Sequence, residues 1–441
     1  MRGAYRLTKS KGTSLSDTAW LLSAGFGLLL VLGVPFAIAL LLTAATVLLV
    51  ADIEPVLLAQ TLISGTQSFS LLAIPFFMLA GEIMSAGGLS QRLIKVADVL
   101  VRHLPGGMGH VTVVSACIFA AISGSAPATT AAIGSIMIPA MVARGYDKAF
   151  ATALAVSAGV LGPLIPPSIA GVIWGVIAEQ SIARLFMAGV GPGLLLAGGL
   201  MVITWMHAKR HDIAREPRAT FSEIRAAFRD GIWALAAPIV VLGGIYGGAF
   251  TPTEAAIVSC VYSALIGVFV EKRLRLAEMP EVILRAMRIT AMVMFIIAAS
   301  AGFGWLVAQE QLALKLAAWL SEGISQRWVM LLAVNMFLFV ICSVMDEIAI
   351  MVILGPLLIV LAQKFGVDPI HFGAIIVTNV AIGMAAPPIG YCLFVGMAIS
   401  GLSLTAVSRA IWPMVLLMLG VLMLTTYVPA FALWLPGLVY R

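Results

Sequence analysis

The sequence predicts an all-α polytopic membrane protein with an inverted repeat of two re-entrant helical hairpins and two broken helices. The 441 residues are 61% hydrophobic and only 10% charged, whereas a soluble domain has about 25% charged residues. Two long apolar segments are interrupted by proline pairs, in LGPLIPPSI (161–169) and IGMAAPPIG (382–390). Backbone polar groups in lipid must be satisfied internally, so long apolar runs without alternation indicate helices rather than a barrel.

About 20 apolar residues are needed to cross a bilayer as a helix. The expected spans are 19–50, 69–86, 149–178, 185–207, 231–249, 252–270, 289–309, 369–400 and 411–434. The first of these runs is longer than a signal-peptide core, so we expect it to be retained. A polar, basic segment at 208–230 lies near the middle of the chain and is expected to be a cytoplasmic linker.

Two further apolar stretches, 107–142 and 328–363, are interrupted midway, at Ser123-Gly124-Ser125-Ala126-Pro127 and at Ser343-Val344-Met345-Asp346-Glu347. Each half is short for a full span, so both stretches are expected to be re-entrant hairpins. Irregular backbone at that depth is tolerated only where protein or water surrounds it. Amphipathic stretches at 89–104 and 312–322 precede the hairpins and are expected to lie at the membrane surface.

The chain therefore divides into six consecutive parts. They are N-terminal scaffold spans (1–86), a first repeat with hairpin 107–142 and broken helix 149–178 (87–207), the linker (208–230), further scaffold spans with an arm (231–309), a second repeat with hairpin 328–363 and broken helix 369–400 (310–400), and a C-terminal span (401–441).

The distribution of basic residues predicts a cytoplasmic N-terminus. With this orientation most of the 26 Lys and Arg residues lie inside, as the positive-inside rule requires. The exceptions are Arg184, Lys315, Arg327, Lys364 and Arg441. Basic clusters can also bind nucleic acid, but here hydrophobic spans flank them, so we expect no nucleic-acid partner.

The two halves of the chain share an ordered set of residues. Gly145, Gly162 and the pair Pro166-Pro167 recur with identical spacing as Gly366, Gly383 and Pro387-Pro388. An isolated proline pair could be a simple kink, but paired interrupted helices at matched positions are typical of secondary-transporter binding sites. The N-terminal ends of half-helices attract anionic groups, and freed backbone carbonyls suit Na⁺.

These motifs resemble the large membrane subunit of tripartite ATP-independent periplasmic (TRAP) transporters, of the DctM type. The resemblance is carried by FFMLAGEIMSAGG (76–88), ISGSAPATTAAIGSIMIPAMVARGY (122–146), LGPLIPPSI, GGIYGGAFTPTEAA (243–256), GVDPIHFG (366–373) and NVAIGMAAPPIGYCLFV (379–395). It implies an elevator-type, Na⁺-driven importer of a small organic acid, which would be a C4-dicarboxylate, keto acid or sugar acid, in the bacterial inner membrane. The expected partners are a small four-helix membrane subunit and a periplasmic substrate-binding protein, with no tightly bound cofactor.

The resemblance also implies site residues at the hairpin tips and proline breaks. For Na⁺ these are Ser123, Gly124, Ser125, Gly162, Ser343, Asp346 and Gly383. For the substrate they are Ser125, Thr129, Pro166, Pro167, Ser168, Asn379, Pro387 and Pro388. The family usually has Thr before the second proline pair, whereas this chain has Ala386, which puts a hydroxyl ligand at that point in doubt.

Less specific interpretations stay open at several positions. The tip serines could serve only to satisfy turn backbone, and Asp346 could serve only as the N3 acid of a capping box that starts at Ser343. Thr251 and Glu254 match a capping box, for which we favour a structural role. The whole chain could also be a stand-alone organic-anion carrier or a membrane scaffold without transport. No catalytic constellation is present in the sequence, so we do not expect an enzyme.

Overall fold

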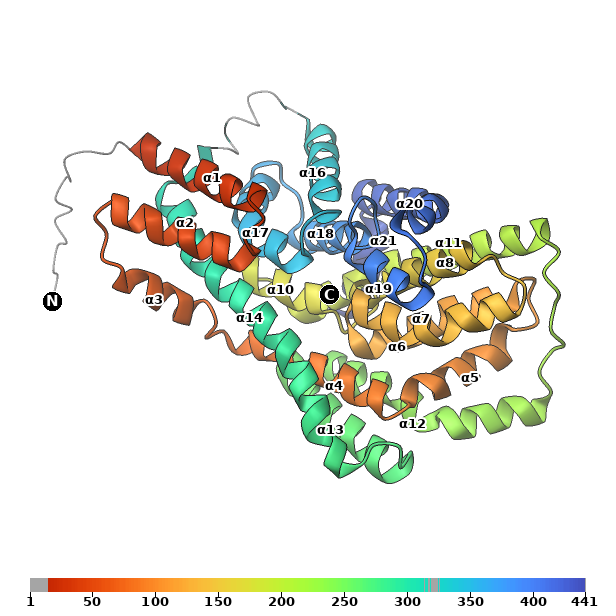
Figure 1. Ribbon diagram of the computed structural model, residues 1–441. Helices are drawn as coiled ribbons and strands as arrows, with labels where there is room; N and C mark the ends of the chain where they lie inside the picture. The colour runs from red at the N-terminus through yellow and green to blue at the C-terminus, as the bar shows by residue number, and fades with distance from the viewer. Residues whose placement is uncertain (1–14, 313, 316–317, 319–323, 325, 441) are drawn as a thin grey trace.

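The computed structural model describes residues 15–440, except 313, 316–317, 319–323 and 325. Within these residues every regular element is helical (Figure 1). Eight of the helices are long and apolar enough to cross a membrane, and a bent pair of helices can supply one more span. The fold class predicted from the composition is therefore confirmed.

The N-terminal region differs from the expected single span over 19–50. Helix α1 (Leu15–Val31) ends before Gly33, whose φ is +77°, and α2 (Phe36–Val50) begins directly after Pro35. The two helices pack against each other (Figure 1), so the prediction of one continuous helix is wrong. Both helices are shorter than the helices that are long enough to cross a membrane, and the cytoplasmic N-terminus stays a prediction. Helix α3 (Val56–Ser64), a 3-10 turn (Phe69–Leu72) and α4 (Ala73–Ala86) follow.

The first predicted repeat consists of consecutive helices with the expected interruptions. They are α5 (Leu89–Val101), α6 (Gly107–Ser123), α7 (Ala126–Ala143), α8 (Lys148–Gly159), α9 (Leu161–Leu164), α10 (Ile169–Ile177) and α11 (Ile182–Arg210). The segments before and after the first proline pair meet at an angle of 42°. Helices α6 and α7 pack side by side as a hairpin.

The middle of the chain forms long helices that start earlier than predicted. Helix α12 (Phe221–Tyr246) begins inside the expected linker, because Thr220 and Glu223 form a capping box. Helix α13 (Pro252–Leu265) carries the expected capping box at Thr251 and Glu254 and continues as a π-helical turn (Ile266–Val270). After a 3-10 turn (Leu276–Glu278), α14 (Met279–Gln309) crosses the molecule from α2 to α13 (Figure 1).

The second predicted repeat has the same order of elements but a more open hairpin. It consists of α16 (Arg327–Cys342), α17 (Glu347–Lys364), α18 (Pro369–Gly383), α19 (Tyr391–Ser400), α20 (Leu404–Tyr427) and α21 (Ala430–Val439). Helices α16 and α17 barely touch each other, and α18 packs against both (Figure 1). The expected surface helix at 312–322 lies largely outside the described residues. The span expected at 411–434 is divided at Val428-Pro429.

The two halves contact each other reciprocally. Helix α10, after the first break, packs on α17, and α19, after the second break, packs on α7 (Figure 1). In both contacts the helices approach closely at a glycine. A Cβ on Gly355 of α17 would lie 2.6 Å from the Ile177 side chain, and a Cβ on Gly134 of α7 would lie 3.3 Å from the Ile399 side chain. Such reciprocal contacts fit the predicted repeat, and both the repeat and its inverted orientation stay predictions.

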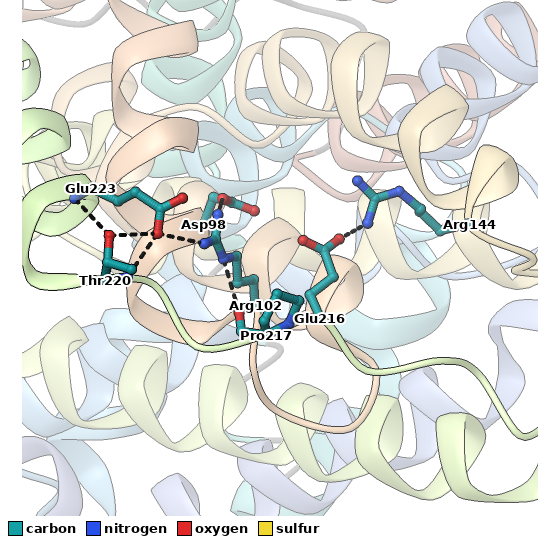
Figure 2. A network of polar contacts seen from close by, with 7 residues as sticks. All are labelled: Asp98, Arg102, Arg144, Glu216, Pro217, Thr220 and Glu223. Carbon is teal, nitrogen blue, oxygen red and sulfur yellow. Dashed lines mark hydrogen bonds and ion pairs between the residues drawn. The ribbon is translucent and has the colours of Figure 1, made fainter.

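Charged residues near the ends of the first hairpin, away from its tip, form ion pairs and hydrogen bonds with the linker and the start of α12 (Figure 2). Arg102 at the end of α5 donates to the Glu223 carboxylate (3.0 Å) and to the Pro217 carbonyl (3.2 Å). The hydrogen bond to Glu223 raises the pKa of the Arg102 guanidinium above its usual value. Arg144, directly after α7, forms an ion pair with Glu216 of the linker. The linker thus connects the arm helix α5, the hairpin and α12.

Candidate functional site

The tip of the first hairpin touches the first proline break through backbone. Gly124 has a φ of +61°, and its carbonyl accepts a hydrogen bond from the Ile169 N–H at 3.2 Å. A Cβ at Gly124 would lie 2.6 Å from the Pro167 carbonyl oxygen. Both the positive φ and the close approach require glycine here. In the first half, the hairpin tip and the proline break are therefore in direct contact.

Gly162 makes the second contact between the same two segments. A Cβ at Gly162 would lie 2.5 Å from the carbonyl oxygen of Ser125 and 2.8 Å from the N–H nitrogen of Ala126. The start of α7 consequently lies directly against the backbone of α9. Because Gly162 was expected to be a site residue together with Ser125, the structure brings this predicted pair together.

The hydroxyl groups near the first break have different partners. Thr129 donates to the Ser125 carbonyl (2.8 Å), and the Ser123 hydroxyl lies 2.8 Å from Thr129 Oγ1. Ser168 accepts from the Gly171 N–H (2.9 Å) and so caps α10. Ser125 occupies the N-cap position of α7, but its side chain makes no capping bond. Among these hydroxyls Ser125 is therefore the one best placed to contact an ion or a substrate.

The second hairpin tip and second break meet in the corresponding way. The Ser343 carbonyl accepts from the N–H groups of Ile389 (3.2 Å) and Gly390 (2.9 Å). Gly383 lies against the backbone of Cys342, at the end of the first hairpin arm. Both proline pairs contain a cis peptide bond, Pro166-Pro167 and Pro387-Pro388. The sequence match between the breaks thus extends to their contacts.

Asp346 lies at a different helix position from the expected one. It is the N-cap residue of α17, and its carboxylate accepts from the N–H groups of Ile348 (3.0 Å) and Ala349 (3.4 Å). The interpretation of Asp346 as N3 of a capping box that starts at Ser343 is therefore wrong. The side chain is nevertheless exposed at the surface of the chain, so capping does not exclude a second contact.

The two breaks differ in exposure. Pro166, Pro167 and Ser168 are buried, whereas Pro388 and Ile389 are exposed, the latter by 40%. The first break is thus sealed by its hairpin. The second break is open beside the exposed Asp346 carboxylate.

Glu347 is a further candidate at the second hairpin tip, which the sequence analysis did not include among the expected site residues. It is the first residue of α17, is only 6% exposed, and its Oε2 has no hydrogen-bond partner among the described residues. The corresponding first residue of α7 is Ala126, so the hairpin fold does not need an acid there. The signal was available, because an acid inside a membrane segment is by default a functional candidate.

Asn379 lies in a buried network instead of at the surface of the break. It is fully buried on α18, and its Nδ2 donates to the carbonyl and the Oδ1 of Asn335 on α16. Asn335 was not singled out in the sequence. A polar residue in the middle of an apolar hairpin arm was the available signal.

The chemistry of the site follows from these groups. Its polar atoms are backbone carbonyls, hydroxyls and carboxylates, the oxygen donors that hard cations prefer, and the unpartnered Glu347 oxygen fits a cation nearby. Among the described residues, no group of three or more His, Cys, Asp or Glu side chains could hold a metal ion together. Helices α7, α10, α17 and α19 all begin at the tips and breaks, where N-terminal ends favour anions.

Known proteins resemble this chain over most of its length. The family model for the DctM component of tripartite ATP-independent periplasmic transporters matches residues 24–431. The C4-dicarboxylate TRAP transporter large permease of Pseudomonas aeruginosa is 43% identical, over 89% of this chain and 92% of its own length. The 2,3-diketo-L-gulonate large permease of Escherichia coli is 38% identical, over 91% and 94% of the two chains.

Further relatives differ in the substrate that they are named for. The sialic acid TRAP transporter large permease of Vibrio cholerae is 34% identical, over 93% of this chain and 96% of its own length. Among solved structures, the YdaH transporter of Alcanivorax borkumensis superposes with a TM-score of 0.66, at 17% identity, over 95% of this chain and 98% of that one. At this identity the structural likeness concerns the fold alone.

Proposed function

Because the chain belongs to the DctM component family of tripartite ATP-independent periplasmic transporters, we propose that it is the permease subunit of a Na⁺-coupled importer of a small organic acid. The inner membrane of a bacterium is its proposed location. The observation that carries the proposal is the pair of matched hydrogen bonds, Ile169 to Gly124 and Gly390 to Ser343, which hold each hairpin tip on its proline break.

The residues of the site divide into two proposed roles. The oxygens of Ser123, Ser125, Ser343 and Asp346, together with the backbone beside Gly162 and Gly383, would hold Na⁺, which supplies positive charge and the driving gradient. The N-terminal ends of α10 and α19 would attract the carboxylate of the acid, since the helix dipole favours an anion there. No arginine lies in the tips or breaks, so these helix ends would have to provide the positive potential.

The proposed movement is of the elevator type. The hairpins and broken helices would move together as a transport domain, because the α7–α19 and α10–α17 contacts join the two halves into one unit. The N-terminal helices, α12 and α13 would form the static scaffold. The linker that pairs Glu216 with Arg144 and precedes α12 would connect the two parts.

Two partner proteins belong to the proposal: a small membrane subunit and a periplasmic binding protein. A relative in Oleidesulfovibrio alaskensis is named isethionate TRAP transporter permease protein DctMQ, and this chain matches 65% of its length at 42% identity. The unmatched remainder of that relative supports a small membrane subunit as a partner of this chain.

Uptake into proteoliposomes tests the proposal. The chain, the small subunit and the binding protein loaded with a radiolabelled acid should accumulate that acid under an inward Na⁺ gradient, and not under an equal K⁺ gradient. Omission of the binding protein should abolish uptake. Uptake that persists without the binding protein would instead support a stand-alone anion carrier, and no uptake under any ion gradient would refute transport by this chain.

A further inference from the structure

Three buried polar side chains form a line across helices α20, α16 and α18. Thr426, Asn335 and Asn379 are 2%, 1% and 0% exposed, respectively. Asn335 Nδ2 donates to Thr426 Oγ1 at 2.8 Å, and Asn379 Nδ2 donates to Asn335 Oδ1 at 3.1 Å. These bonds connect residues that are distant in the sequence, so they determine how the three helices are placed.

The hydrogen bonds in this line run in one direction. The Thr426 hydroxyl donates its hydrogen to the Leu422 carbonyl at 2.7 Å, so its oxygen can only accept from Asn335. The Asn335 amide is thereby oriented with its nitrogen toward Thr426 and its oxygen toward Asn379. Asn379 Nδ2 also donates to the Asn335 carbonyl at 3.0 Å.

The orientation of the Asn379 amide follows without ambiguity. A flipped amide would place Oδ1 against two acceptors of Asn335, whereas an amide oxygen can only accept. Asn379 Oδ1 therefore points away from Asn335, where it is buried and receives no hydrogen bond from the described residues. A buried acceptor without a donor destabilises the folded chain by about 1–3 kcal/mol. We therefore expect a ligand to donate a hydrogen bond to this oxygen.

Asn379 itself lies close to the second tip and break. Asn379 is one helical turn before Gly383, on the same face of α18, and Gly383 packs on Cys342 at the hairpin tip. Helix α8 of the first half and α18 of the second half begin with matching aspartate caps, Asp147 and Asp368. At the position that corresponds to Asn379, α8 has the fully buried Ala158, so the fold itself does not need a polar group there.

We propose that Thr426 and Asn335 are positioning residues that make Asn379 an acceptor-only contact for a hydroxyl group of the transported acid. A carboxylate cannot fill this role, because it has no hydrogen to donate, whereas a hydroxyl can. The transported acid would thus be a hydroxy acid rather than its deoxy analogue. This inference rests on the proposed transport function and narrows its substrate class.

The test compares pairs of acids that differ by one hydroxyl. Purified full-length chain would be titrated with malate against succinate, and with lactate against propionate, and its thermal unfolding monitored. Wild type should prefer the hydroxylated member of a pair by about 3- to 10-fold in half-saturating concentration, the effect of one net hydrogen bond. Thr426→Val frees the Asn335 amide to rotate and should abolish the preference, while Thr426→Ser should retain it.

Thr425→Val is the matched control. Thr425 is equally buried and donates to the carbonyl four residues earlier, Val421 at 2.8 Å, but no asparagine donates to it among the described residues. Its variant should keep the wild-type preference. The inference is overturned if wild type favours no hydroxylated acid, if Thr426→Val keeps the preference, or if Thr426→Val changes only the half-saturating Na⁺ concentration. Failure of vesicle uptake for every acid would instead refute the proposed function itself.

Discussion

Substitution of Gly162 by alanine should separate the first hairpin tip from its break. The new Cβ would lie 2.5 Å from both the carbonyl carbon and oxygen of Ser125 and 2.8 Å from the Ala126 nitrogen. These are backbone atoms, so relief requires movement of the whole tip. Overpacking of this kind costs about 1–3 kcal/mol, while alanine gains at most about 1 kcal/mol over glycine in a helix.

Gly304→Ala is the control, because it gains the same helix propensity of alanine over glycine without a steric clash. Gly304 lies within α14, and a Cβ there meets no atom within 4 Å. The two variants should therefore differ in stability by the overpacking cost alone, about 1–3 kcal/mol. Thermal unfolding of the purified proteins and Na⁺-driven uptake measure the effect, and uptake should fall only in Gly162→Ala. Equal unfolding temperatures and equal uptake in the two variants would refute the contact argued here.

Three further substitutions test other parts of the account. Asp346→Asn should leave stability unchanged, because asparagine caps a helix as well as aspartate, but should raise the half-saturating Na⁺ concentration for uptake; an unchanged value would leave Asp346 a cap only. Glu216→Arg should change the uptake rate through repulsion of Arg144, and the exchanged pair Arg144→Glu with Glu216→Arg should restore it; no recovery would exclude the ion pair as the cause. Thr251→Ala should destabilise the chain by about 1 kcal/mol through loss of the cap of α13 without affecting Na⁺ dependence, which denaturation and uptake would measure.

The sequence predicted the breaks well because their causes are local. Proline removes a helix hydrogen bond wherever it occurs in a helix interior, so both breaks followed from Pro166-Pro167 and Pro387-Pro388. The start of α12 also has a local cause, because Thr220 and Glu223 form a capping box. The polar composition of the segment nevertheless led to the prediction of a linker there. The local sequence thus contained the signal for the start of α12, although the segment was predicted to be a linker.

Contacts between distant segments could not be predicted in the same way. The separation of α16 from α17 depends on α18, which packs against both. The partner of Asn379 is likewise Asn335 on another helix. Such pairings depend on tertiary packing, which hydrophobic pattern and spacing do not encode. The structure brings the predicted tip and break segments into contact, whereas the pairing of Asn379 with Asn335 was not anticipated, and the roles of the site residues stay predictions.

The central claim is that the two tips and two breaks hold the transported acid and Na⁺ together. A cryo-EM structure of the reconstituted complex with both bound would test it most directly. The account predicts density for the acid between Ser125, the N-terminal end of α10 and the second break, with a cation beside the oxygens of a hairpin tip. Density for the acid elsewhere, for example in the apolar groove that Gly199 and Leu417 line between α11 and α20, would contradict it.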